Sequence, residues 1–172
     1  MKIFGGVRRL MLMSLTVMCG LCSAAHAQDV LDNTGLLGMS AGELTSRLPG
    51  IQAVRAPRRL SSGALGSLRV PDALYGGLHF EQTLYLAHQK LQQTDLVLNS
   101  PEPGQVDTLM QTLRARLGPE LASSFSTSDA LIDTASWVNG DADVTLFHVA
   151  PPARPGIRLV IKQRQLRDAS EL

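Results

Sequence analysis

Residues 78–98 read LHFEQTLYLAHQKLQQTDLVL, and this stretch decides the fold. Over residues 78–87 apolar side chains alternate with polar or amphipathic ones, and Gln82 interrupts the apolar row. The apolar row holds Leu78, Phe80, Leu84 and Leu86, and the opposite row holds His79, Glu81, Thr83 and Tyr85. A period of two predicts a strand with one buried and one wet face. Residues 87–90 then predict a turn, and residues 91–98 predict the partner strand of an antiparallel hairpin.

A first helix is predicted upstream of this hairpin. The sequence Ser40-Ala41-Gly42-Glu43 fits a capping box, in which Ser40 and Glu43 each satisfy one backbone donor of the first turn. Leu44 and Leu48 lie four residues apart on one face, and Pro49-Gly50 ends the helix.

A second helix is predicted downstream of the hairpin, after the Pro-rich and Gly-containing loop 99–104. Apolar residues recur there at steps of three and four, which is the period of an amphipathic helix. They are Val106, Leu109, Met110, Leu113 and Leu117. Arg114 and Arg116 lie in the last turn, where cations are favoured, and Gly118-Pro119 ends the helix.

Strands on either side complete the predicted architecture. Residues 64–70 predict a strand that Pro71-Asp72 ends, and residues 136–138, 143–149 and 157–163 predict three more, with Asn139-Gly140 as a hairpin turn. The order is helix and three strands, repeated twice. We therefore predict an α+β fold in which an antiparallel sheet carries both helices on one face.

The predicted domain limits follow from the same pattern. Residues 28–166 form a single domain, within which the repeat suggests tandem halves at 38–99 and 104–164. Residues 167–172 are charged and predict a flexible tail.

The first 27 residues predict a cleavable signal peptide. Lys2, Arg8 and Arg9 precede an apolar run over residues 10–21, and Ala25-His26-Ala27 supplies small residues at the −3 and −1 positions of a cleavage site. The apolar run is shorter than the ~20 residues that a membrane span requires. The sequence thus predicts export to the periplasm, cleavage near Ala27/Gln28, and a soluble mature chain without a stable membrane span.

Export changes the composition that matters. Removing 27 of 172 residues leaves 145, which is one ordinary domain. Both cysteines, Cys19 and Cys22, lie within the signal, so the mature chain has no thiol, no disulfide and no cysteine metal site. The mature chain has 13 basic and 15 acidic residues, a net charge of −2, and this balance does not indicate nucleic-acid binding.

Three features of the chain are the helix entry Gly38-Met39-Ser40-x-x-Glu43-Leu44, the alternating hairpin, and the later step from Trp137 to Gly140. In these features the chain resembles small exported α+β modules related to the β-lactamase inhibitory protein and to the outer-membrane assembly lipoprotein of the SmpA/OmlA type. The resemblance implies the fold and a role in binding an envelope protein. The chain lacks the lipid-anchoring cysteine of the lipoproteins and the disulfides of the inhibitor.

Candidates for chemistry are sparse. His79 and His148 lie at comparable places in the two halves, so a small metal-dependent or hydrolytic envelope enzyme using both is one alternative. The turn Asn139-Gly140-Asp141-Ala142-Asp143 has oxygen ligands at alternate positions, as calcium loops do, but lacks their later glutamate. The serines lie in loop-like segments without a Gly-x-Ser-x-Gly motif. We therefore expect no catalytic residue, no metal and no cofactor.

Binding residues are predicted instead among the scarce aromatics and the arginines. Tyr75 is expected in the loop 72–77 and Tyr85 on the polar side of a strand, both outside the core, and Trp137 leads into a hairpin. Aromatic side chains anchor protein interfaces, so all three are predicted binding residues. Arg58 and Arg59 are part of a basic cluster after the first helix. The predicted function is a non-enzymatic module that binds another envelope protein, such as an inhibitor or immunity protein, with an envelope-assembly accessory as an alternative.

Overall fold

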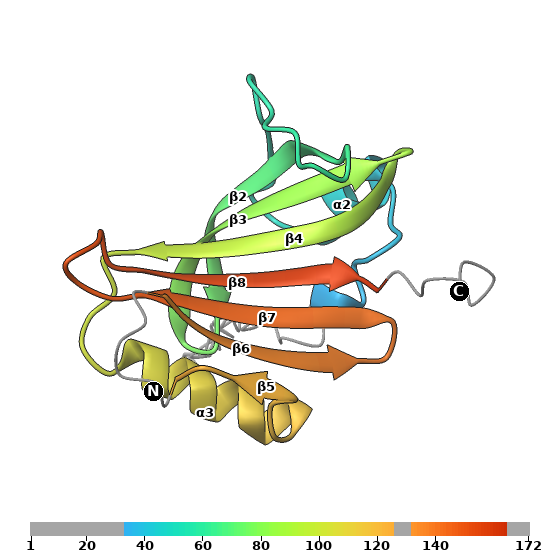
Figure 1. The fold of residues 1–172 in the computed structure, drawn as a ribbon. Coiled ribbons are helices and arrows are strands. Elements are labelled where there is room, and N and C mark those ends of the chain that lie inside the picture. The colour runs from blue at the N-terminus through green and yellow to red at the C-terminus, as the bar shows by residue number, and fades with distance from the viewer. Residues whose placement is uncertain (1–32, 126–131, 165–172) are drawn as a thin grey trace, which may run out of the picture.

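The computed structural model describes residues 33–125 and 132–164. The predicted signal peptide and the predicted tail lie outside these ranges. Figure 1 labels the elements, which in chain order are α2 (Ala41–Arg47), β1 (Gln52–Ala53), β2 (Leu65–Tyr75), β3 (Leu78–Ala87), β4 (Lys90–Asn99), α3 (Gln105–Leu117), β5 (Ala122–Ser123), β6 (Ile132–Asn139), β7 (Ala142–Val149) and β8 (Gly156–Gln163). Within the described ranges, no helix is long and apolar enough to cross a membrane.

All eight of these strands belong to one antiparallel sheet in the order β1-β2-β3-β4-β8-β7-β6-β5. The α+β class and the antiparallel sheet are therefore confirmed. The predicted repeat of a helix and three strands is not confirmed. Each of the helices α2 and α3 precedes four strands, and the first strand of each group has two residues. The two groups of strands join side by side through β4 and β8, where Leu96 lies opposite Leu159.

The first helix begins as its sequence predicts. The backbone N–H of Ser40 donates to Glu43 Oε2 at 2.7 Å, and the Glu43 N–H donates to Ser40 Oγ at 3.4 Å. These reciprocal bonds satisfy donors that the first turn leaves free. Leu44 is buried on the inward side of the helix, and Leu48 caps its end.

Strand β2 is longer than its sequence suggests. Pro71 was expected to end it, but the strand continues to Tyr75 through a bulge between Val70 and Ala73. A proline has no N–H to donate, so it fits at a bulge where the ladder is already interrupted. The extension carries Tyr75 into the sheet instead of a loop.

The hairpin of β3 and β4 has the predicted bounds to within one residue. His88 and Gln89 form its turn with φ values of 49° and 60°, the backbone signs of a type I′ turn. Gln82, which interrupts the apolar row, is fully buried, and its Nε2 donates to Asn33 Oδ1 at 2.8 Å. A bulge between Tyr85 and Leu86 ends the strict alternation.

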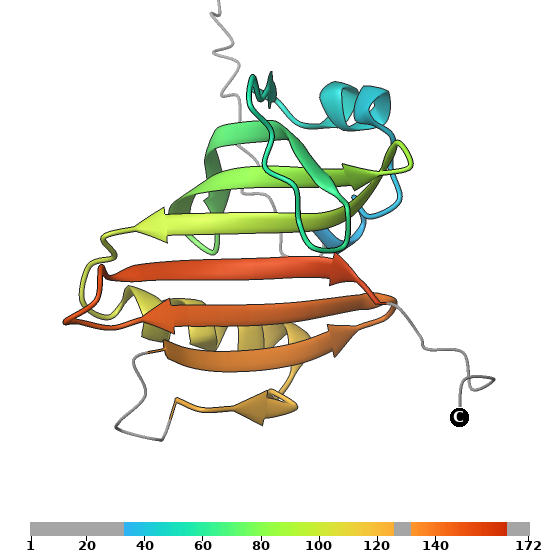
Figure 2. The same ribbon diagram turned by 45° about the horizontal axis from the view of Figure 1, so that its top comes forward.

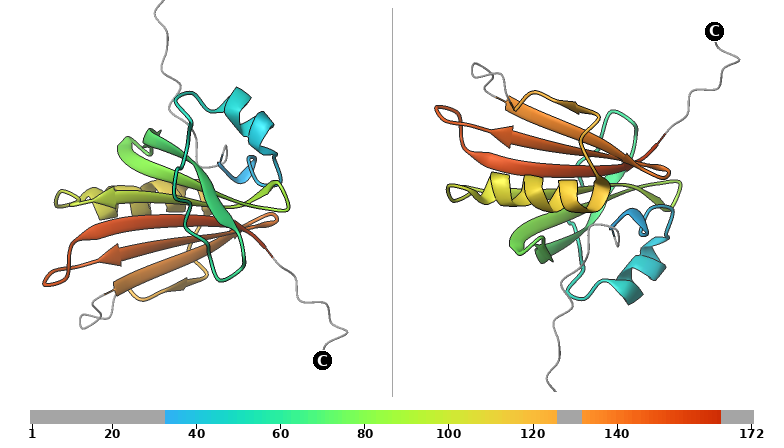
Figure 3. Two further views of the ribbon diagram at one scale, coloured as in Figure 1. Left: turned by 90° about the horizontal axis from the view of Figure 1, so that it is seen from above. Right: turned by 90° about the horizontal axis from the view of Figure 1, so that it is seen from below.

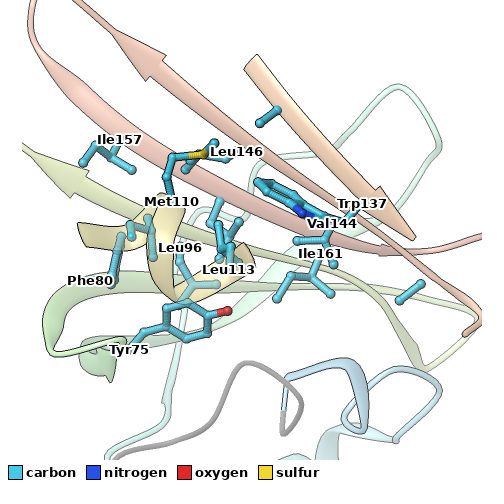
Figure 4. Close-up of a cluster of buried hydrophobic side chains, with 14 residues drawn as sticks. Tyr75, Phe80, Leu96, Met110, Leu113, Trp137, Val144, Leu146, Ile157 and Ile161 are labelled. Atoms are coloured by element: carbon cyan, nitrogen blue, oxygen red, sulfur yellow. The ribbon is translucent and has the colours of Figure 1, made fainter. Parts of the chain in front are cut away.

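Both helices pack on one face of the sheet, as predicted (Figure 3). Leu109, Met110 and Leu113 of α3 join the larger core cluster, in which they meet Phe80, Leu96, Trp137, Leu146 and Ile157 (Figure 4). Leu44 of α2 joins the smaller cluster with Leu84 and Leu91. The two clusters lie on the same side because Phe80 and Leu84 are four residues apart on one strand, before its bulge.

A long connection covers part of the opposite face. Residues 54–64, here called the strap, leave β1, cross in front of β3 and β4, and return to β2 (Figure 2). The N–H of Gly66 donates to the carbonyl of Arg58 at 2.9 Å, and the N–H of Leu60 donates to the carbonyl of Ala64 at 2.9 Å. Ala64 is buried, so the strap is anchored to the sheet by its returning end.

Candidate functional site

The half of the sheet formed by β6, β7 and β8 has an uncovered face. In Figure 2, α3 lies behind these strands and no described segment crosses them in front. The strand registers place one set of side chains on this front surface, which we call the open face. It consists of Ile132, Thr134, Ser136, Val138, Asp143, Thr145, Phe147, Val149, Arg158, Val160 and Lys162.

The open face has an apolar part near one end. Ile132 lies opposite Val149, and Thr134 lies opposite Phe147. Ile132 is 51% exposed, which is a high value for an isoleucine. Phe147 and Val149 are half-buried. β-Branched and aromatic residues side by side make a firm surface, because such side chains lose little rotamer freedom on contact.

Arg158 lies on β8, an inner strand of the sheet. Its side chain is on the side of the sheet that faces away from the helices, here called the outer side. Arg158 is directly opposite Phe147 on β7 and Val97 on β4. Its Nη2 donates to Asp95 Oδ2 at 2.5 Å, while the Nε2 of Gln93 donates to Asp95 Oδ1 at 2.7 Å. The Asp95 side chain is 4% exposed and that of Arg158 is 41% exposed. A buried carboxylate thus holds an exposed guanidinium in one orientation.

The predicted residues Arg58 and Arg59 are exposed on the strap. The guanidinium of Arg59 donates to the carbonyl of Gly63 at 2.8 Å, which closes the strap on itself. A polar cavity of about 340 Å³ lies beneath the tip of the strap, and it is lined in part by Ser61, Gln93 and Lys162. The strap therefore borders the open face at its β8 side.

The expected loop position of Tyr75 is wrong, and the predicted binding residue Trp137 is buried. Tyr75 is 0% exposed, and its ring meets Phe80 edge-on with centroids 5.9 Å apart. Trp137 is 2% exposed, and its indole N–H donates to the carbonyl of Gly118 at 3.0 Å. Both rings fill the core beneath α3 (Figure 4), because an aromatic side chain buries a large apolar area there.

The expectation that Tyr85 lies on a wet strand face is also wrong. The residue does point away from the helices, but the strap and Gly66 cover it, so it is only 5% exposed. Burial raises the pKa of its hydroxyl, and the nearby Asp95 raises it further, whereas Arg58 and Arg158 act in the opposite direction. Tyr85 therefore supports the strap instead of presenting a ring to a partner.

The two histidines do not form one site. His79 is exposed on the outer side, where its Nδ1 lies 2.6 Å from Asp72 Oδ1. His148 lies on the helix side, opposite the buried Ile157, with its Nδ1 3.4 Å from Asp133 Oδ2 and its ring stacked on Phe125. The sheet itself separates the two imidazoles, so they do not form the shared site that the enzyme alternative would use.

The turn considered for calcium makes ion pairs with cations. Asp143 lies 3.8 Å from Lys162 Nζ and 3.9 Å from Arg164 Nε. Within residues 33–125 and 132–164, no group of three or more histidine, cysteine, aspartate or glutamate side chains could hold a metal ion.

Sequence reasoning missed the residues that define the open face. The alternation over residues 143–149 sets Phe147 and Val149 on the side opposite to Leu146, which is a signal of this face in the sequence. The pattern does not show which strand pairs with which. It therefore cannot predict that Arg158 contacts Asp95, which is 63 residues away in the sequence. No protein-family description, curated protein or solved structure matches the chain.

Proposed function

We propose that the chain is an exported, non-enzymatic protein whose open face binds another protein of the cell envelope, in the manner of an inhibitor or an immunity protein. The observation that carries this proposal is the asymmetry of the sheet. One face is covered by α2 and α3, and the other exposes Ile132, Phe147 and Val149 over β6 and β7.

The make-up of the open face supports a protein as the partner. Its apolar part is bordered by Thr134, Ser136 and Thr145, which offer hydroxyl groups, and by the charged pair of Lys162 and Asp143. An apolar centre with a polar rim is the usual composition of a protein interface. An aromatic residue and an arginine side by side, as Phe147 and Arg158 are, belong to the types enriched in binding hot spots.

Placement in the periplasm is part of the same proposal. The basic start, the short apolar run and Ala25-His26-Ala27 support export, and the resemblance to exported inhibitor and assembly modules supports the same compartment. An envelope-assembly role remains the alternative within the same class, since it uses the same kind of surface. Mass spectrometry of the protein from a periplasmic fraction should show an N-terminus at Gln28; an intact leader would contradict export.

A comparison of matched charge variants tests the binding surface. Phe147→Glu puts a charge in the apolar part of the open face, whereas Ala115→Glu puts the same charge on the exposed side of α3. Each protein is cross-linked in periplasmic extract, the captured partner is identified, and its affinity is measured with purified proteins.

We expect Phe147→Glu to weaken the purified complex by tenfold or more, because it removes the aromatic ring from the apolar part of the open face and puts there a charged group that must lose its water when the partner binds, while Ala115→Glu stays within about twofold. Unfolding curves of both variants check that each one folds. Recovery of no stoichiometric partner, or equal affinity of the two variants, would sink the proposal.

A further inference from the structure

We propose that Arg158 is a receptor for a carboxylate group, so that the partner of the open face presents an acidic surface, and that Asp95 is the positioning residue that orients the guanidinium. This inference rests on the proposed function and names the chemistry of the partner. It is carried by the geometry of Arg158 and by the distribution of charge on the outer side of the sheet.

The geometry leaves most of the guanidinium free for a ligand. Asp95 uses one nitrogen, Nη2, and among the described residues the structure gives Arg158 no other hydrogen-bond partner. A guanidinium has five N–H donors in a planar fork that matches a carboxylate with two parallel bonds. Val97 and Phe147 flank the side chain on the neighbouring strands, so a bound carboxylate would sit against apolar walls that strengthen the pairing.

The carboxylate that contacts Arg158 is itself held in place. Asp95 is buried and accepts from both Arg158 and Gln93, so its carboxylate has a partner on each oxygen. The orientation of the guanidinium is therefore set before any ligand arrives. A pre-oriented arginine loses less side-chain entropy on binding than a free one.

A second arginine, Arg58, lies on the same side of the sheet as Arg158. Arg58 on the strap and Arg158 on β8 both act on the hydroxyl of Tyr85, so both guanidinium groups lie within electrostatic reach of one point on the outer side. The cover formed by the strap brings Arg58 there, because its carbonyl is bonded to Gly66, which lies opposite Tyr85.

The outer side as a whole is basic. The outer side and the strap together have seven basic residues, which are Arg55, Arg58, Arg59, Arg69, Arg158, Lys162 and Arg164. The same surface has four carboxylates, which are those of Asp72, Glu81, Asp95 and Asp143. The rest of the described chain has five basic and six acidic residues. Charge complementarity therefore favours an acidic partner, and such fields speed the encounter of partners.

Poly-L-glutamate is the probe for this inference, because it presents carboxylates and needs no knowledge of the partner. Its binding to the purified chain is measured at low and at physiological salt, beside a DNA duplex and phosphatidylglycerol vesicles. The variants are Arg158→Gln, Arg158→Lys and Asp95→Asn, and Arg154→Gln is the control that removes an exposed arginine from the loop between β7 and β8.

We expect Arg158→Gln to weaken poly-L-glutamate binding about tenfold, as the loss of a charge-assisted pair does, and Arg154→Gln to change it less than about twofold. Arg158→Lys keeps the charge and loses the planar fork, so it should weaken binding by about threefold or more. It also keeps a cation beside Asp95, and it serves as the folded variant if Arg158→Gln unfolds.

Asp95→Asn gives the sharpest outcome. Removal of a negative charge from an anion-binding surface strengthens binding if only net charge matters. If Asp95 positions the guanidinium, the same change weakens binding. Stronger binding of Asp95→Asn, equal effects of Arg154→Gln and Arg158→Gln, or equally tight binding of DNA or vesicles would overturn the inference. None of these outcomes depends on the partner, so they are distinct from a failure of the Phe147→Glu comparison.

Discussion

The ring of Tyr85 occupies the space beside Gly66 that a side chain there would need. A Cβ placed on Gly66 would lie 3.0 Å from Tyr85 Cε1 and 3.0 Å from Thr83 Cγ2. The two residues are direct neighbours across β2 and β3, and the N–H of Gly66 also holds the strap through Arg58. The missing side chain therefore lets an aromatic ring and the strap close over the sheet together.

Gly66→Ala should destabilise the protein by about 1–3 kcal/mol, because the added methyl group meets a packed ring and neither backbone can move apart within the ladder. The matched control is Gly42→Ala, in α2, where a Cβ meets nothing within 4 Å and the helix gains slightly from alanine. Urea unfolding measures both changes. Equal stability of the two variants would show that the strap adjusts freely.

Tyr75→Phe should leave stability unchanged or raise it by up to about 1 kcal/mol. The Tyr75 hydroxyl is buried and has no hydrogen-bond partner among the described residues, so its removal costs little. Tyr75→Ala should cost about 3–5 kcal/mol, because it empties the space beneath Phe80. A large loss in Tyr75→Phe, measured by thermal unfolding, would contradict this role.

The buried hydroxyl of Tyr75 should make the protein less stable at high pH. Burial raises the pKa of its hydroxyl well above the ordinary value of 10.0. The unfolded chain then loses this proton first, so the contribution is present below about pH 10 and declines as pH rises above it. The slope of unfolding free energy against pH above 10 should be shallower in Tyr75→Phe. An unchanged slope would place the effect elsewhere.

The ion pair of Glu120 with Arg114 should make the protein less stable at low pH. Hydrogen bonds from Arg114 at 2.9 Å and 2.6 Å lower the pKa of Glu120 to about 2. A lowered pKa adds stability above the ordinary value of 4.5, and that stability is lost as pH falls toward 2. The acid unfolding of Glu120→Gln should therefore depend less on pH than that of Glu102→Gln, a control at an exposed residue before α3.

Trp137 is the single tryptophan of the chain and reports directly on the core. Its burial and its bond to Gly118 predict a blue-shifted emission that moves to the red on unfolding. Trp137→Phe loses this hydrogen bond and some volume, so we expect a loss of about 1–3 kcal/mol. Strong quenching of the native emission by acrylamide would contradict a buried indole.

Local patterns predicted the elements whose own residues decide their structure. The capping box at Ser40, the helical spacing from Val106 to Leu117, and the alternation over 78–87 are all borne out in the structure. Each signal lies within one short run of consecutive residues. Nearest-neighbour geometry is enough to set it.

The same patterns failed where distant segments meet. Pro71 is tolerated because a bulge accommodates it, and Tyr85 is buried because the strap covers it. The open face could be predicted only in part, since the alternation placed Phe147 on the side opposite to Leu146 but not beside Arg158. Interactions such as Arg158 with Asp95 depend on the pairing of β4 with β8.

The chain alone thus determined the class of the fold, both helices and the antiparallel hairpins, because hydrophobic period and turn chemistry act over a few residues. Only the tertiary structure decided which face stays uncovered, which aromatic rings are buried, and which arginine a carboxylate orients. Those features depend on where strands far apart in sequence come to lie side by side, and the long-range packing of the whole sheet sets that arrangement.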